Sequence, residues 1–229
     1  MKETVCLISQ DFYPLNGGIA SYLLSVYKKY FSEINFEVIV PESLGLEKDF
    51  SNLPFKVHRT RFAPFNFNDP ERENCNKMIL ERLNLIKPKV IIFGYIRSHL
   101  EVGISYKQLN PETKIVLFTH GKEAFIDDCI TPKTNINLVQ KGYSLEESKF
   151  YKNLLNSLDI ILSVSHFTKK LLQGQVITPE IIVLNPPISE AKEIDMDSAR
   201  RILGISDNGP VLLSVGRLVK RKGHEMVVA

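Results

Sequence analysis

The sequence predicts an α/β fold, in which a parallel β-sheet carries helices on both faces. Short runs rich in Val, Ile, Leu and Phe recur along the chain, and such runs are typical of strands that are buried on both faces. Segments with helical periodicity separate these runs. This alternation of strand and helix is the pattern of a doubly wound domain.

The elements follow one another regularly. The runs that predict strands are TVCLIS (4–9), FEVIV (36–40), FKVHRT (55–60), KVIIFG (89–94), KIVLFTH (114–120), DIILSVS (159–165), EIIVLN (180–185) and PVLLSVG (210–216). Apolar residues fall at i, i+3, i+4 and i+7 between Ile19 and Phe31, which predicts an amphipathic helix. The same spacing recurs at Tyr151, Leu154, Leu155 and Leu158.

The chain is expected to contain two units, residues 1–190 and residues 191–229. Pro186 and Pro187 end the seventh strand, because proline lacks the N–H group that a central strand needs. After a polar linker, DSARRILGI (197–205) predicts a short helix, and PVLLSVG predicts the first strand of a truncated second domain. We expect this orphan strand to pack on the first domain, to pair with another molecule (self-association) or to be poorly ordered.

Composition argues against several classes of protein. The net charge of +3 is spread along the chain and forms no basic stripe, so no nucleic-acid partner is expected. The apolar runs are much shorter than the roughly 18 residues of a membrane span. The three cysteines lack C-x-x-C spacing, which indicates neither a zinc site nor a disulfide framework and predicts a reducing, cytoplasmic compartment.

The first candidate site is the turn within SQDFYPLNGGIASY (9–22). Gly17 and Gly18 stand where a helix begins, so its uncovered N–H groups and its dipole can attract a phosphate or a sugar hydroxyl. The absence of a Cβ lets a ligand approach closely. The dinucleotide fingerprint G-x-G-x-x-G is not present. A tight turn that only starts the helix is the structural alternative.

The second candidate is His120, which follows a predicted strand and precedes Gly121. An imidazole at the carboxyl edge of the sheet can donate to a sugar hydroxyl or stabilise developing positive charge. A purely structural histidine is the alternative. His58 and His99 lack a flanking glycine turn, and His166 is expected to start a helix.

Three further stretches have both a structural and a functional interpretation. Ser163 or Ser165 can cap the following helix, a role compatible with a ligand contact. Arg217 and Lys222 lie in a basic turn that can neutralise a diphosphate leaving group or simply be solvated. The D-x-D sequence at Asp195 is interpreted as a helix cap and not as a metal site.

The aromatic segment RFAPFNFND (61–69) also has two interpretations. Its residues Phe62, Phe65 and Phe67 can enter the core, as aromatic residues usually do. The proline and the two asparagines instead favour an exposed loop that contacts an acceptor or a membrane.

Together these stretches resemble the retaining glycosyltransferases of group 1 (family four). FYPLNGGIASYL is similar to the family's glycine-rich first loop, FTHG to its histidine loop, and LDIILSVSHFTKKLL to its AD-x-V-I-A-V-S-x-x-T segment. The family's G-R-L-x-x-x-K-G motif is matched by Gly216, Arg217, Leu218, Lys222 and Gly223.

The resemblance implies a GT-B fold of two facing Rossmann-like domains. Residues 1–190 would be the acceptor-side N-terminal half, a Rossmann-like parallel sheet with helices on both faces. The implied reaction transfers a sugar, with retention of configuration, from a nucleotide-sugar donor to a saccharide or lipid-linked acceptor. No metal or other cofactor is expected, because in this family the leaving phosphate is thought to help deprotonate the acceptor.

The resemblance also assigns site residues. The catalytic residue would be His120, in contact with the donor sugar. The donor-binding residues would be Gly17, Gly18, Ser165, Arg217 and Lys222. The acceptor-binding residues would be Tyr13, Asn16 and Phe65.

Two departures from the family pattern bear on these expectations. Asn185 is followed by Pro186-Pro187 where the family often has Asn-Gly, and residues 191–229 contain no E-x-x-x-x-x-x-x-E motif, which grips the donor in the second domain. We therefore expect little or no activity from this chain alone.

Family membership suggests a role in bacterial surface polysaccharide synthesis, in the cytoplasm or at the inner membrane face. A nucleotide-sugar epimerase or hydrolase of the same fold and a non-catalytic GT-B-like binding subunit are the alternatives.

Overall fold

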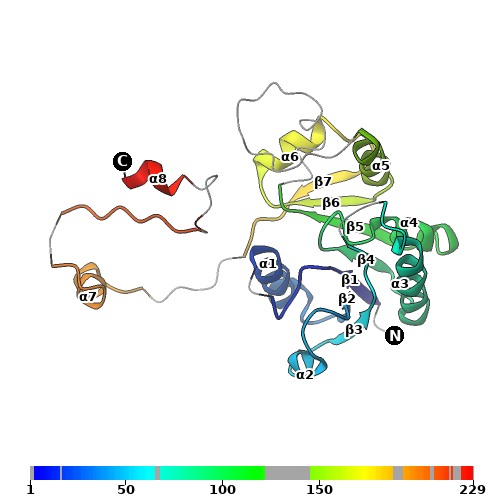
Figure 1. The fold of residues 1–229 in the computed structure, drawn as a ribbon, viewed down its shortest axis with the longest axis horizontal. Helices are drawn as coiled ribbons and strands as arrows, with labels where there is room; N and C mark the ends of the chain where they lie inside the picture. The colour runs from blue at the N-terminus through cyan, green and yellow to red at the C-terminus, as the bar shows by residue number, and fades with distance from the viewer. Residues whose placement is uncertain are drawn as a thin grey trace. The chain divides into compact units, whose positions relative to one another are not determined.

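A seven-stranded parallel sheet forms the centre of the first of two compact units, with strand order β3-β2-β1-β4-β5-β6-β7 (Figure 1). The computed structural model describes residues 3–15, 17–64, 68–121, 145–187, 193–206, 209–216, 218 and 223–228. The strands are β1 (Thr4–Ile8), β2 (Asn35–Pro41), β3 (Lys56–Thr60), β4 (Val90–Phe93), β5 (Lys114–Thr119), β6 (Ile160–Ser163) and β7 (Glu180–Val183). The first seven predicted strands are thus confirmed.

Alternate residues of each central strand enter two separate hydrophobic cores. In β4, Ile91 and Phe93 join one core and Ile92 joins the other. All three side chains are almost completely buried. Apolar runs without a polar alternation are therefore explained by the sheet having no solvated face.

Helices cover both faces of the sheet, as expected for a Rossmann-like fold (Figure 1). One core contains side chains of α1 (Gly18–Val26), the π-helical turn η1 (Tyr27–Phe31) and α2 (Glu47–Phe50). The opposite core contains side chains of α3 (Arg72–Ile86), α4 (Leu100–Leu109), α5 (Leu145–Asn156) and α6 (His166–Gln173). The predicted helical stripe from Ile19 to Phe31 corresponds to α1 together with η1.

The chain divides into two compact units, and the described residues from 193 onward belong to the second. This unit contains α7 (Met196–Ile202) and α8 (His224–Val228). Asp195 is the N-cap of α7, and its Oδ1 accepts a hydrogen bond of 2.9 Å from the backbone N–H of Ser198. The capping interpretation of the D-x-D sequence is therefore confirmed.

The predicted strand at residues 210–216 is wrong for this structure. Residues 209–216 form no strand, and the side chains of Leu212, Leu213 and Val215 are all more than 80% exposed. A strand needs a neighbour that shares its backbone hydrogen bonds, and no described residue pairs with this segment. Apolar composition alone therefore did not produce a strand.

The strand order reverses between β1 and β4: β2 and β3 lie on one side of β1, and β4 to β7 lie on its other side. Gly94 directly follows β4 at this switch point. Its N–H donates to the carbonyl of Ile8 over 2.9 Å. A Cβ at Gly94 would lie 2.6 Å from Ser9 Oγ and 2.8 Å from Leu23 Cδ1. The close approach of β1, β4 and α1 therefore requires glycine at this position.

We predict that Gly94→Ala lowers the free energy of unfolding by about 1–3 kcal/mol, because the added methyl group overpacks a closed site. Gly18→Ala is the matched control, since a Cβ there meets no atom within 4 Å. Urea denaturation measures both changes. Equal stability of the Gly94→Ala and Gly18→Ala chains would contradict the packing account.

Candidate functional site

The carboxyl ends of the parallel strands lie along one edge of the sheet, where folds of this type bind their ligands. The turn that contains Gly17 follows β1, His120 follows β5, and Ser165 follows β6. Tyr22, one helical turn after Gly18, contacts His120 through its ring. The fold therefore brings the glycine turn and His120 to one place at this edge.

The glycine turn leaves the start of α1 open. Gly17 is the N-cap residue, with φ −134° and ψ 158°, and among the described residues no side chain caps the helix. A Cβ at Gly17 would only touch Asp11 Oδ1 at 3.5 Å, and a Cβ at Gly18 would meet nothing. Neither backbone conformation nor packing against described residues requires these glycines. Gly17 suits the N-cap position, and the pair of glycines leaves space for a ligand at a positively polarised helix start.

Asp11 places a carboxyl group beside this turn. Its backbone is fixed by the buried Ser9, whose Oγ donates to the Asp11 carbonyl over 2.9 Å and accepts from the Asp11 N–H over 3.2 Å. Partial burial raises the pKa of Asp11. A carboxylate at this position can accept hydrogen bonds from sugar hydroxyls. The sequence did not single out Asp11, because only the fold brings it next to Gly17.

His120 is held in one tautomer. Its Nε2 lies 2.8 Å from the carbonyl oxygen of Gly94. A carbonyl can only accept, so Nε2 carries the proton. Burial lowers the pKa of His120, although the bond to Gly94 opposes this shift. The ring is thus neutral at pH 7, with its proton on Nε2 and none on Nδ1.

Ser165 caps α6, since its Oγ accepts from the backbone N–H of Thr168 over 3.1 Å. Tyr13 is 37% exposed and contacts the edge of the Phe50 ring, with the ring centroids 6.4 Å apart. The remaining predicted site residues, Asn16, Phe65, Arg217 and Lys222, lie outside the described residues.

The histidines that lack a glycine turn have structural roles. His58 pairs with Glu37 across β2 and β3 at 2.5 Å, and His166 begins α6. Phe62 packs against the core and meets the ring of His99 edge-on, with the centroids 5.1 Å apart. For Phe62 the core interpretation is therefore correct, whereas Phe65 and Phe67 lie outside the described residues.

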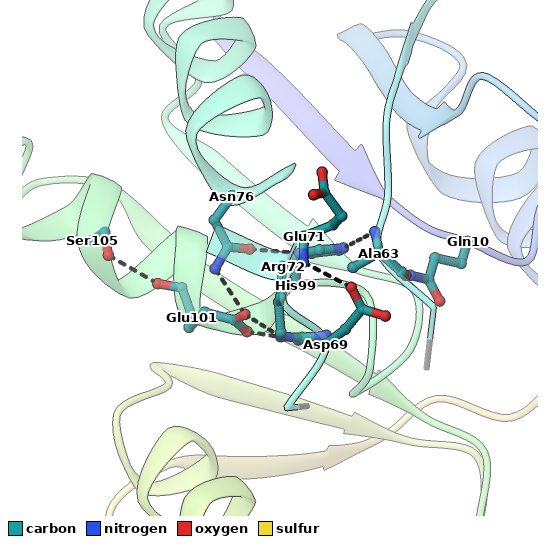
Figure 2. Close-up of polar contacts among 9 residues, drawn as sticks. All are labelled: Gln10, Ala63, Asp69, Glu71, Arg72, Asn76, His99, Glu101 and Ser105. Carbon is teal, nitrogen blue, oxygen red and sulfur yellow. Dashed lines mark hydrogen bonds and ion pairs between the residues drawn. The ribbon is translucent and has the colours of Figure 1, made fainter. Parts of the chain in front are cut away.

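A buried polar network closes the same edge of the sheet between α3 and α4 (Figure 2). Arg72 donates to both carboxylate oxygens of Glu101, over 2.7 and 3.0 Å, and only 6% of its side chain is exposed. Burial tends to raise the pKa of Glu101, but the bonds to Arg72 and Asn76 outweigh this effect and keep it below its ordinary value. The carboxylate therefore stays charged inside the protein.

Proton positions along this network follow from its partners. The backbone N–H of Ala63 donates to His99 Nε2 over 3.1 Å, so the proton of a neutral ring must be on Nδ1. Nδ1 donates to Asn76 Oδ1 over 2.5 Å, and Asn76 Nδ2 donates to Glu101 Oε1 over 3.0 Å. His99 thus has the opposite tautomer to His120. Figure 2 shows the chain of contacts from Ala63 through His99 and Asn76 to Glu101.

The network fastens the segment that follows β3 to the turn that follows β1. The carbonyl of Ala63 accepts from Gln10 Nε2 over 3.0 Å, while the backbone N–H of Gln10 donates to Ser98 Oγ over 3.2 Å. Ala63 is therefore held by both of its backbone polar groups, one toward His99 and one toward Gln10. This arrangement sets the path of the chain on one side of the glycine turn.

His99 should make stability depend on pH. Complete burial, followed in importance by the charge of Arg72, lowers the pKa of His99 to about 4. The unfolded chain binds its proton near pH 6.5 and the folded chain only near pH 4, so stability rises with pH across this window. We expect His99 to raise the free energy of unfolding by about 3 kcal/mol between pH 4 and pH 7, as measured by urea denaturation.

His99→Gln is the control for this prediction, because glutamine does not titrate. Its unfolding free energy should be lower at pH 7 but should change less between pH 6.5 and 4. Parallel pH profiles of the two chains would contradict the assignment to His99.

The described residues contain no group of three or more His, Cys, Asp or Glu side chains placed to hold a metal ion. Within the same residues, no helix combines the length and the apolar character that a membrane span needs.

Comparisons with solved structures identify the architecture. Sucrose-phosphate synthase from Thermosynechococcus elongatus aligns with 99% of this chain and 59% of its own chain, at 16% identity and a TM-score of 0.67. Anabaena HepE, solved in complex with UDP, aligns with 90% of this chain and 51% of its own, at 14% identity and a TM-score of 0.60. UDP-N-acetylglucosamine 2-epimerase from Rickettsia bellii aligns with 81% of this chain and 45% of its own, at 12% identity and a TM-score of 0.52.

The fold is of the GT-B type. Its Rossmann-like α/β sheet is shared with these proteins, as the sequence predicts. The chain spans about half the length of the structures it matches. No protein-family model and no curated protein matches the sequence.

Proposed function

We propose that the protein is a glycosyltransferase that moves a sugar from a nucleotide-sugar donor to an acceptor with retention of configuration. In this proposal the chain supplies the acceptor-side domain. One observation carries it: the open start of α1 and the fixed, neutral His120 meet at the carboxyl edge of a GT-B-type sheet. This combination suits a ligand with both hydroxyl groups and anionic oxygens.

The chemistry of the two groups is complementary. The N–H groups at the start of α1 donate to phosphate or sugar oxygens. The neutral imidazole of His120 would contact the donor sugar. Asp11 accepts from hydroxyl groups that reach the glycine turn, which favours a saccharide there over a second phosphate.

The other predicted roles are part of the proposal. Arg217 and Lys222 would neutralise the departing diphosphate, and Ser165 would add a donor-side contact. Tyr13, Asn16 and Phe65 would contact the acceptor. No metal is assigned to the reaction. The resemblance in sequence favours surface polysaccharide synthesis in the cytoplasm, at the inner face of the membrane, as the setting.

An epimerase or hydrolase is the second candidate, because the Rickettsia enzyme shares the fold. The two candidate activities can be separated by incubating labelled nucleotide sugars with a protein that includes this chain together with any further domain encoded with it. A transferase consumes donor only when an acceptor saccharide is present, whereas an epimerase or hydrolase needs no acceptor. An α-linked product from an α-linked donor, identified by NMR, would support retention.

We predict that UDP-glucose, ADP-glucose or GDP-mannose, at concentrations on the order of millimolar, shifts the NMR signals of Gly18, Gly94 and His120 in the 229-residue chain. Gly18→Ala should weaken this binding roughly tenfold, about 1.4 kcal/mol, because its methyl group occupies ligand space. The unfolding free energy should not change, since that methyl group meets no protein atom.

The matched control is Gly174→Ala, at the end of α6, which should alter neither binding nor stability. Little or no sugar transfer is expected from the 229-residue chain alone. Robust transfer by this chain, or ligand shifts confined to another part of the fold, would contradict the proposal.

A further inference from the structure

Tyr22, on α1, contacts three residues elsewhere in the fold: Phe118, His120 and Leu184. The side chain is only 6% exposed and extends from the helix one turn after Gly18. Its ring meets the His120 imidazole edge-on, with centroids 5.4 Å apart and planes at 86°. It also meets the Phe118 ring at 5.4 Å and 89°.

The hydroxyl of Tyr22 has a separate partner. It donates to the backbone carbonyl of Leu184 over 2.8 Å. Burial raises the pKa of Tyr22, so the hydroxyl keeps its proton at physiological pH. Leu184 directly follows β7, just before Asn185 and the proline pair that ends the strand.

We propose that Tyr22 is a positioning residue: its ring holds the His120 imidazole, and its hydroxyl holds the end of β7. One side chain of α1 would then link the glycine turn, His120 and the point where the chain leaves the sheet. The inference rests on the proposed function only in assigning His120 to the ligand. The contacts themselves do not depend on it.

The ring contact acts together with the Gly94 carbonyl. That carbonyl fixes which nitrogen of His120 carries the proton, while the Tyr22 ring blocks one side of the imidazole. A ring without this neighbour can rotate about its side-chain bonds and exchange its bond to Gly94 for water. His120 would then present either nitrogen to a ligand, and its pKa would move back toward the ordinary value.

The two contacts can be separated by mutation. Tyr22→Phe keeps the ring and removes the hydroxyl, whereas Tyr22→Leu removes both. Tyr27→Phe is the control, because Tyr27 is equally buried in the following turn but packs on Phe36 and Phe55. Tyr22→Met serves as a second ring-free variant if the leucine chain does not fold.

The test is NMR of the ¹⁵N-labelled 229-residue chain without ligand. In Tyr22→Leu or Tyr22→Met, His120 should become a mixture of tautomers and its pKa should rise. In Tyr22→Phe, His120 should be unchanged, while amide exchange at Leu184 should accelerate roughly fivefold through loss of one buried hydrogen bond. Tyr27→Phe should change neither signal.

An unchanged His120 in the ring-free variants would overturn the inference, as would equal effects of the Tyr22→Phe and Tyr27→Phe changes on amide exchange at Leu184. Since no ligand or turnover enters this measurement, its failure differs from a failure of the proposed function. A chain that binds no sugar can still show the predicted response of His120.

Discussion

The close approach of β1, β4 and α1 at Gly94 is the constraint on which the candidate site depends. No side chain fits at this position, because the side chains of Ser9 and of Leu23 in α1 pack directly against Gly94. This contact sets the start of α1 relative to the sheet. It also directs the Gly94 carbonyl at His120 and thereby decides which nitrogen of the imidazole is protonated.

On the other side of the glycine turn, the carboxyl edge of the sheet is stabilised by the buried ion pair of Arg72 and Glu101 and not by close apolar packing. Arg72 and Glu101 are removed from water, and desolvation of such a pair is compensated only when the geometry is good and the remaining lone pairs are satisfied. The bidentate contact and the Asn76 bond provide this geometry at the Glu101 carboxylate, whereas Arg72 Nη1 is buried without a hydrogen-bond partner among the described residues. Removing either charge would leave the other buried, which typically costs about 3–5 kcal/mol. Through Asn76 and His99 the network reaches the Ala63 N–H, and the Ala63 carbonyl accepts from Gln10.

The sequence predicted the parts of the fold that local composition decides. The central strands were identified because each lies between two helical layers and is apolar on both faces, whereas β3 (KVHRT), at the edge of the sheet, is only partly buried. The same rule failed at residues 210–216, where an apolar run pairs with no strand among the described residues. The helix start at Gly17, the caps at Ser165 and Asp195, and the position of His120 were also accessible, since each follows from the residue and its immediate neighbours.

The polar network and the roles of Asp11 and Tyr22 were not accessible from the sequence. Their partners are far apart along the chain: 36 residues separate Ala63 from His99, and 162 separate Tyr22 from Leu184. Only the order of strands in the sheet brings these groups together. His99 has no local feature that marks it, although its left-handed backbone (φ 61°) and complete burial distinguish it in the folded protein.

The ring-nitrogen spectrum of the two histidines tests this account most directly. A long-range ¹H–¹⁵N NMR experiment on the 229-residue chain at pH 7 reports the protonated nitrogen of each imidazole. The account predicts opposite tautomers, with the proton on Nε2 in His120 and on Nδ1 in His99. The same tautomer in both rings, or a charged His120, would contradict it.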